Sequence, residues 1–231
     1  MYNEGAVIEK TARTLDEYMK KTFRAGEYEI IFADDGSADG CGDKVRALDL
    51  PDVKVISYTP NRGKGYAVRT AFLAAKGDVI MFTDADLAYG AGVIGRVYDM
   101  MSANQSADVL IGSRNLTKDG YEAYTPIRKI ASKMYIKVLC ITGGFKLSDS
   151  QCGCKAFRYE AVQKIFPRCE VDRFAFDFEA ILWANKLGMK IIEMPVKLIN
   201  HGETKVNIVR DTIKMLKDLR KMKKRIRKAK I

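Results

Sequence analysis

Short apolar runs alternate with longer amphipathic stretches along the first half of the chain. Four runs of β-branched or apolar residues resemble strands that are buried on both faces of a sheet: 28–33, 53–58, 78–83 and 108–113. Helical patterns separate these runs, at roughly 4–24, 38–48, 64–76 and 90–103. Strands that alternate with helices of this length predict βαβ units, and therefore an α/β fold with a mostly parallel sheet.

The second half of the chain is less regular but continues the alternation. Its pattern predicts, in order, a helix near 127–141, a break at Gly143 and Gly144, a strand around 154–159, a helix over 176–188, a strand at 190–196 and a basic helix over 207–228. No repeat or low-complexity tract interrupts this order. We therefore predict one domain over residues 1–206, followed by a basic amphipathic helix over 207–231.

The chain enters its first predicted helix directly after Met1-Tyr2-Asn3-Glu4, without a strand before it. In open α/β sheets the functional loops follow the carboxyl ends of strands. The strand that would present Tyr2, Asn3 and Glu4 is therefore missing from the pattern. Either this start is internal to a longer gene product, or the sheet tolerates the loss of the strand.

The composition is that of a folded chain. The 231 residues are 47% hydrophobic and 30% charged, which permits a substantial core. No window approaches the roughly 18 consecutive apolar residues of a membrane-spanning helix, and the N-terminus does not resemble a signal peptide. The five cysteines are an odd set and include a C-x-C at Cys152 and Cys154. We predict reduced thiols in the cytoplasm rather than disulfides or a structural zinc site.

Positive charge is concentrated at the C-terminus. The net charge of the whole chain is +11, and residues 205–231 hold twelve Lys or Arg against two Asp. Apolar residues recur there at helical spacings: Val209, Ile213, Leu216, Leu219, Met222 and Ile226. The pattern predicts an interfacial helix that brings the protein to an anionic membrane surface, without nucleic acid as a partner. The alternative is a helix whose first turns pack on the domain and whose end is solvated.

Three acidic clusters lie next to predicted strands. Asp34 and Asp35 begin D-D-G-S, Asp84 and Asp86 form D-A-D, and Asp149 begins D-S-Q. Ligands of open α/β sheets bind outside the carboxyl ends of strands, so the first two clusters are expected to face one site. Carboxylates are the preferred ligands of Mg²⁺ or Mn²⁺, and two like charges this close require a positive partner. The same aspartates could instead cap helices or begin turns.

Basic residues accompany the acidic clusters. N-R-G-K-G at 61–65 lies between a strand and a helix, where backbone amides and the helix dipole favour an anion. Its spacing is wrong for a dinucleotide fingerprint. Arg114 follows the fourth predicted strand, and Arg128 follows Pro126 at the start of a helix. Each of these features alone could be a plain turn or a surface arginine.

The order and spacing of the motifs resemble the family 2 glycosyltransferases. The matching motifs are Y-N-E, D-D-G-S-x-D, N-R-G-K-G, D-A-D, G-S-R, D-S-Q-C-G-x-K, V-D-R-F-A-F-D-x-E and G-E-T-K, from Tyr2 to about Leu219. Among these families the chain looks most like the dolichyl-phosphate β-glucosyltransferases and other polyprenyl-phosphate glycosyltransferases. D-D-G-S and D-x-D belong to the whole superfamily, whereas N-R-G-K-G, D-S-Q-C-G and R-F-A-F-D are typical of the glucosyl-type group.

The resemblance implies a GT-A-like fold and a donor site for UDP-glucose. In that site Tyr2, Glu4 and Asp34 or Asp35 would hold uracil and ribose. Asp84 and Asp86 would bind the diphosphate through Mg²⁺ or Mn²⁺, and Lys64 would lie near the donor phosphates. The chain departs from the family pattern at two places: the proline and strand before Y-N-E are missing, and Ala88 replaces a glutamine that assists the metal in mannosyl-type relatives.

The resemblance also implies an acceptor and a reaction. Arg114, Arg128 and Lys205 would receive phosphate on the acceptor or leaving-group side. A polyprenyl phosphate is already largely ionised at neutral pH, so it needs orientation by arginines more than a general base. The expected reaction is inverting transfer of a hexose at the cytoplasmic membrane surface.

Several alternatives stay open. If a base assists, Asp149 and Asp177 are the candidates, although Asp177 and Glu179 could be polar positions on a helix whose other face packs inward. His201 could approach the diphosphate or be an ordinary loop histidine. The acceptor could also be a soluble glycan or a protein, or the chain could be a non-catalytic membrane-surface protein.

Overall fold

The computed structural model describes residues 1–120, 126–199 and 208–230, and of 126–128, 131 and 208–215 it describes the backbone only. The strands are β1 (Ile30–Asp34), β2 (Val53–Ser57), β3 (Val79–Phe82), β4 (Val109–Ser113), β5 (Lys155–Arg158) and β6 (Ile191–Pro195). The α-helices are α1 (Ile8–Thr22), α2 (Cys41–Arg46), α3 (Lys64–Ala74), α4 (Val93–Ala103), α5 (Pro126–Gly143), α6 (Tyr159–Ile165), α7 (Phe176–Lys186) and α8 (Ile208–Lys228). Every predicted helix and strand is present, and α6 is an addition that the pattern did not predict.

The strands form two sheets rather than one. β1 and β2 pair in parallel, with Ile30 opposite Val53, and the other four strands have the order β3-β5-β4-β6. Within the larger sheet β4 and β6 are parallel, whereas β5 runs antiparallel to both of its neighbours. The expectation of a mostly parallel sheet therefore holds except at β5, which comes from later in the chain and enters between the consecutive strands β3 and β4.

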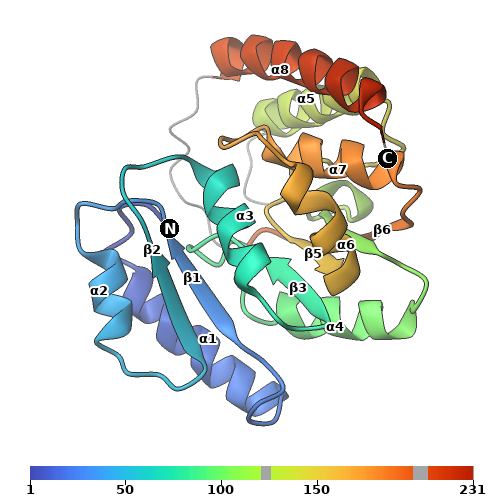
Figure 1. The fold of residues 1–231 in the computed structure, drawn as a ribbon. Helices are drawn as coiled ribbons and strands as arrows, with labels where there is room; N and C mark the ends of the chain where they lie inside the picture. Colours follow the sequence, from blue (N-terminus) through green and yellow to red (C-terminus); the bar gives the residue numbers. More distant parts are fainter. Residues whose placement is uncertain (121–125, 200–207, 231) are drawn as a thin grey trace.

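Helices cover both faces of the larger sheet (Figure 1). Val109 and Ile111 on β4 point into a core shared with α3 and α5–α8, and Leu110 between them points into a core shared with α4. This alternation follows from the two-residue period of a strand. A third core, around Phe32 and Ile8, packs α1 and α2 against β1 and β2. The carboxyl ends of β1, β3 and β4 thus lie near the loops that carry the acidic clusters.

The first residue of the chain lies beside β1 in the manner of a strand. The Met1 amino group donates to the carbonyl of Ala33 at 2.7 Å, and the amide of Asp35 donates to the carbonyl of Met1 at 3.0 Å. Burial lowers the pKa of this amino group. Within the described residues, no further strand joins β1 to the four-stranded sheet.

A strand added before Tyr2, of the type V-x-I-V-x-P, should therefore stabilise the fold. The extension would pair with the free edge of β1 and replace a buried ammonium group with a neutral peptide. We expect thermal unfolding to shift upwards by about 5 °C, the effect of about 2 kcal/mol on a domain of this size. Thermal melting followed by circular dichroism tests this, with a Gly/Ser extension of equal length as the control. Equal melting temperatures for the two extensions would show that pairing a strand with β1 does not stabilise the fold.

The C-terminal helix packs against the rest of the molecule. Leu219, Met222 and Ile226 are buried in the same core as α5 and α7, and Leu216 is partly buried there. Figure 1 shows α8 lying alongside α5 at one end of the molecule. The prediction that this apolar stripe faces a membrane is wrong for these four residues, because they already contact protein. The predicted boundary at 206 lies outside the described residues.

Two further observations concern the cysteines and the described helices. All five cysteines are buried free thiols. Of the helices in the described ranges, none combines the length and the apolar character that crossing a membrane requires.

Candidate active site

Asp35, at the end of β1, organises the loop that carries N-R-G-K-G. Its carboxylate accepts hydrogen bonds from the Tyr58 hydroxyl at 2.8 Å, the Asn61 side-chain amide at 2.7 Å, and the backbone amides of Arg62 and Gly63, each at 2.8 Å. Burial, followed by the hydrogen bond to Asp35, raises the pKa of Tyr58. Because both of its oxygens accept hydrogen bonds, the Asp35 carboxylate holds the conformation of this loop. It thereby positions Lys64, the residue after Gly63.

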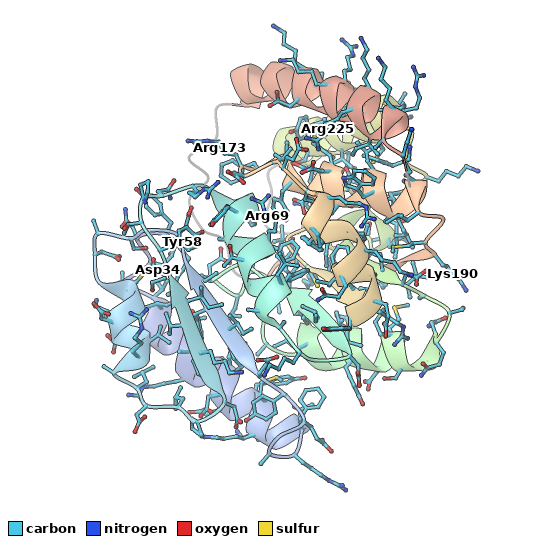
Figure 2. All side chains as sticks on the ribbon, viewed as in Figure 1. Asp34, Tyr58, Arg69, Arg173, Lys190 and Arg225 are labelled. Atoms are coloured by element: carbon cyan, nitrogen blue, oxygen red, sulfur yellow. The ribbon has the colours of Figure 1, made fainter. Side chains whose placement is uncertain are left out.

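Asp34 and the first residues of the chain form the neighbouring edge of the site. The Asp34 carboxylate accepts from the Ser37 amide at 3.1 Å and the Ser57 hydroxyl at 3.2 Å. The backbone amide of Asn3 donates to the Ser37 hydroxyl, and the side-chain carbonyl of Asn3 accepts from the Ala38 amide, each at 3.0 Å. These contacts place Tyr2 and Glu4 next to D-D-G-S, and Figure 2 shows Asp34 and Tyr58 at the same end of the β1–β2 pair.

Lys64 connects this edge to the D-A-D motif. It is the first residue of α3, and its amine forms an ion pair with Asp84. Burial opposes the charge on Lys64, but the Asp84 and Asp177 carboxylates outweigh burial and raise the pKa of the amine. The positive partner that Asp84 requires is thus supplied, in the protein itself, by Lys64.

Asp86 is the second carboxylate of D-A-D. It accepts a hydrogen bond from the Ala88 amide at 3.0 Å, while burial and the nearby Asp84 charge raise its pKa. Across the described ranges, no group of three or more His, Cys, Asp or Glu side chains converges on one point. Two hard oxygen donors fit Mg²⁺ or Mn²⁺ when the remaining ligands are water and substrate phosphate. Asp84 and Asp86 therefore suit a cation that is shared with a diphosphate.

The third acidic motif also reaches D-A-D, through a glycine. A Cβ atom added to Gly153 would lie 2.2 Å from Oδ2 of Asp84, so only glycine lets the carboxylate lie against this backbone. The Gly153 amide donates to the Tyr89 hydroxyl at 3.3 Å. D-S-Q-C-G is thereby held beside D-A-D, a contact that the sequence pattern did not predict.

Asp149 and Arg114 form a buried pair. Nε of Arg114 lies 2.7 Å from one Asp149 oxygen, Nη2 lies 3.1 Å from the other, and the amide of Gln151 donates to Asp149 at 3.0 Å. Glu193 on β6 holds the preceding turn by accepting from the amide of Ser148 at 2.9 Å. Since Asp149 is fully buried, it positions the guanidinium and has no carboxylate oxygen open to an acceptor. We therefore withdraw Asp149 as a candidate base.

Asp177 belongs to a second buried pair. It lies in the first turn of α7, 2.8 Å from the amine of Lys155, which also donates to the carbonyl of Cys152 at 2.7 Å. Burial raises the pKa of Asp177, while the charges of Lys155 and Lys64 oppose that rise. Asp177 therefore stays a candidate by its location near Asp84, and the buried Lys155 is an ion-pair partner that the sequence analysis missed.

Glu179 has a structural role. It is fully buried, accepts from the amides of Glu170 and Val171 at 2.9 and 2.7 Å, and pairs with Arg225 of α8. The loop before α7 contacts N-R-G-K-G and α3 through Asp172, which pairs with Arg62 and Arg69. Figure 2 shows Arg69 and Arg173 on the same side of the molecule as Arg225. The alternative placed Glu179 on a polar face opposite the packed face of the helix, whereas the structure buries Glu179 completely.

Three predicted site residues cannot be placed. The side chain of Arg128 and the whole of His201 and Lys205 lie outside the described residues. Their roles stay predictions.

The relatives found by comparison with known proteins are named as glycosyltransferases. The chain is 31% identical over 222 residues to the dolichyl-phosphate beta-glucosyltransferase ALG5C of Trichomonas vaginalis, covering 90% of this chain and 64% of that protein. It is 31% identical to the dolichyl-phosphate beta-glucosyltransferase of Dictyostelium discoideum, over 84% of this chain and 63% of the relative. A third relative, the glycosyltransferase AglD of Haloferax volcanii, is 30% identical, and the chain covers 34% of it. The chain thus spans less than two thirds of the length of these relatives.

Solved structures show the same fold. The glucosyl-3-phosphoglycerate synthase of Mycobacterium tuberculosis, solved with Mn²⁺, UDP-glucose and glycerol 3-phosphate, superimposes with a TM-score of 0.69 at 16% identity, covering 95% of this chain and 77% of that one. This likeness confirms the expected GT-A-like fold. Residues 1–166 match the family described as Glycosyl transferase family 2. With most of its length in that match, the chain belongs to glycosyl transferase family 2.

Proposed function

We propose that the protein transfers glucose from UDP-glucose to a polyprenyl or dolichyl phosphate, with inversion at the anomeric carbon. The proposal includes peripheral association with the cytoplasmic surface of a membrane, where the phosphate of such a lipid lies. The names of the relatives support the glucosyl donor and the lipid phosphate acceptor.

The observation that carries the proposal is the meeting of three motifs around Asp84. Lys64 of N-R-G-K-G pairs with this carboxylate, Gly153 of D-S-Q-C-G packs against it, and Asp86 lies two residues away in the chain. A nucleoside diphosphate sugar requires both positive charge and a metal-binding carboxylate at its diphosphate. The arrangement around Asp84 supplies both from neighbouring loops.

On the donor side, Asp84 and Asp86 would hold Mg²⁺ or Mn²⁺. The cation would neutralise charge on the departing UDP. Lys64 lies beside Asp84 and would contribute a second positive charge to the diphosphate. Tyr2, Glu4 and Asp34 would bind the uridine, whereas Asp35 would act through the loop that it holds.

On the acceptor side, Arg114 would bind the lipid phosphate. Its bidentate pair with Asp149 leaves the guanidinium fixed in orientation, and fixed donors bind a phosphate with little loss of side-chain entropy. Burial disfavours the charge on Arg114, but Asp149 outweighs burial and raises its pKa, so the group stays a cation. Arg128 and Lys205 would add positive charge, and an ionised phosphate acceptor removes the need for a general base.

A panel of donors and acceptors tests the proposal. The protein is incubated with UDP-glucose, UDP-galactose, GDP-mannose or GDP-glucose and Mn²⁺ or Mg²⁺. The acceptor is a detergent-dispersed polyprenyl phosphate, a soluble glycan or a peptide. We expect hexose in the organic phase only with UDP-glucose. Transfer to a soluble glycan or a peptide instead would establish a different acceptor, and absence of transfer with every donor would support the non-catalytic alternative.

Replacing Gly153 with alanine should impair transfer without unfolding the protein. The new Cβ would overlap the Asp84 carboxylate and displace it from Lys64 and from the metal. We expect kcat to fall about 10-fold to 100-fold, the cost of misplacing a group that orients a metal or a reacting atom. Gly92→Ala is the matched control, because Gly92 has an ordinary helical φ of −60° and an added Cβ would meet nothing within 4 Å. Equal loss in both variants would contradict the assignment.

A further inference from the structure

One face of α5 exposes large apolar side chains to solvent. Ile130, Met134, Val138 and Ile141 are 61%, 64%, 45% and 69% exposed. They are spaced by four, four and three residues, so they lie on one side of the helix. The opposite side, with Ile136 and Leu139, is buried in the core. The outward face is therefore a continuous apolar stripe and not a set of scattered residues.

Positive charge borders this stripe. Lys133 and Lys137 are exposed on the same side of α5. The adjacent helix α8 adds exposed basic residues: Lys217, Arg220, Lys221, Lys223, Lys224, Arg227 and Lys228. Lys223 donates to the carbonyl of Thr142 at 3.2 Å, which joins the basic surface of α8 to the end of the α5 stripe. Figure 2 shows basic side chains of α8 extending away from the protein.

A hollow lies beside the stripe and borders chain neighbours of the candidate active site. It has a volume of about 410 Å³ and is lined by Lys133, Lys137 and Ile141 of α5 and, across from them, by Asn115 and Ser148. Asn115 and Ser148 are the chain neighbours of Arg114 and Asp149, and the Asn115 side chain donates to the carbonyl of Ser148 at 2.6 Å. The hollow beside the α5 stripe is thus bordered by the chain neighbours of the buried Arg114–Asp149 pair.

We propose that the outward face of α5 docks on an anionic lipid bilayer. Ile130, Met134 and Ile141 enter the boundary between headgroups and acyl chains, and Lys133 and Lys137 extend to the lipid phosphates. α8 contributes long-range attraction through its basic side chains, while Leu219, Met222 and Ile226 stay in the core. This inference rests on the proposed function for its biological purpose, since it sets the hollow beside Arg114 at the lipid surface.

Charge favours a bilayer over a second copy of the chain as the occupant. A two-fold contact through α5 would bring the lysines of both copies together with the basic surfaces of α8, and like charges across an interface are unfavourable. An anionic leaflet instead complements the exposed basic residues of α5 and α8.

Vesicle co-sedimentation separates the apolar from the electrostatic contribution. Vesicles contain phosphatidylcholine and phosphatidylserine at roughly three to one, which gives an anionic surface. We expect Ile130→Ser/Met134→Ser/Ile141→Ser to bind about tenfold more weakly than the unchanged protein, and to lose residual binding at high salt. The control is Leu73→Ser/Tyr98→Ser, which removes similarly exposed apolar residues from α3 and α4. Equal binding by the two variants would overturn the proposal.

A tryptophan probe reports insertion directly. The chain has one tryptophan, Trp183, which is buried. Met134→Trp therefore adds a solvent-exposed fluorophore, whose emission should shift to the blue on vesicle addition and be quenched by brominated lipid. Leu73→Trp should show neither change. A blue shift of Met134→Trp that depends on protein concentration without vesicles would identify a second copy as the occupant and overturn the proposal.

These readouts do not require catalysis. If the unchanged protein inserts α5 but fails to transfer glucose to detergent-dispersed acceptor, the proposed function fails and the docking surface stands. If transfer occurs and α5 does not insert, the docking surface fails alone.

Discussion

Asp86→Asn should abolish glucosyl transfer and leave the fold intact. The side chain is exposed beside Asp84, and its amide replacement keeps the shape while removing a charged metal ligand. Loss of metal stabilisation of the departing UDP should lower kcat about 10³-fold, equivalent to about 4 kcal/mol of transition-state free energy. Steady-state transfer assays at saturating Mn²⁺ measure this directly.

Two controls define the metal as the cause. Asp99→Asn changes an exposed aspartate on α4 and should leave kcat unchanged. EDTA should inactivate the unchanged protein, and added Mn²⁺ should restore it. Full transfer in EDTA, or near-normal kcat in Asp86→Asn, would show that transfer does not require a metal ion at Asp84 and Asp86.

Truncation after Asn207 should unfold the protein rather than merely detach a tail. It removes Leu219, Met222 and Ile226 from the core, each worth about 1.5–3 kcal/mol when fully buried. It also removes Arg225 from the buried Glu179, and an ion left unpaired in a core costs about 3–5 kcal/mol. Their sum is comparable with the whole stability of a domain, about 5–15 kcal/mol, so we expect loss of the cooperative melting transition.

A charge variant separates packing from electrostatics in this helix. Lys217, Lys221 and Lys224 are exposed, so their replacement by glutamine should keep the melting temperature within a few degrees. The same variant should bind anionic vesicles more weakly at low salt. A truncated chain that melts cooperatively near the temperature of the full chain would show that α8 is an appendage.

The sequence pattern predicted the elements well because each carries a strong helical or strand pattern of apolar residues. It could not show that β5 runs antiparallel between β3 and β4, since the partners of a strand are distant in sequence. The apolar stripe of α8 is the clearest case. Spacing identified it correctly, but whether such a stripe meets lipid or protein depends on what lies opposite it, here α5 and α7.

The site was predictable as a set of motifs, but not as a set of contacts. Asp84, Asp86, Lys64 and Arg114 stand out as charges at the ends of strands and the start of a helix. That Asp149 holds Arg114, or that Gly153 makes room for Asp84, depends on the approach of loops about 35 to 70 residues apart. Lys155 stood out as the last residue of D-S-Q-C-G-x-K, but nothing in the pattern paired it with Asp177. Glu193 gave no signal, because a single charged residue in an apolar run is compatible with either surface or core.

The structure of the reaction product tests the central claim most directly. The protein is incubated with UDP-[¹³C]glucose, polyprenyl phosphate and Mn²⁺, and the lipid fraction is examined by mass spectrometry and NMR. The account predicts a single glucose joined through its anomeric carbon to the lipid phosphate in the β configuration, from an α-linked donor. An α-linked product would contradict single displacement, and label confined to the aqueous phase would contradict the lipid acceptor itself.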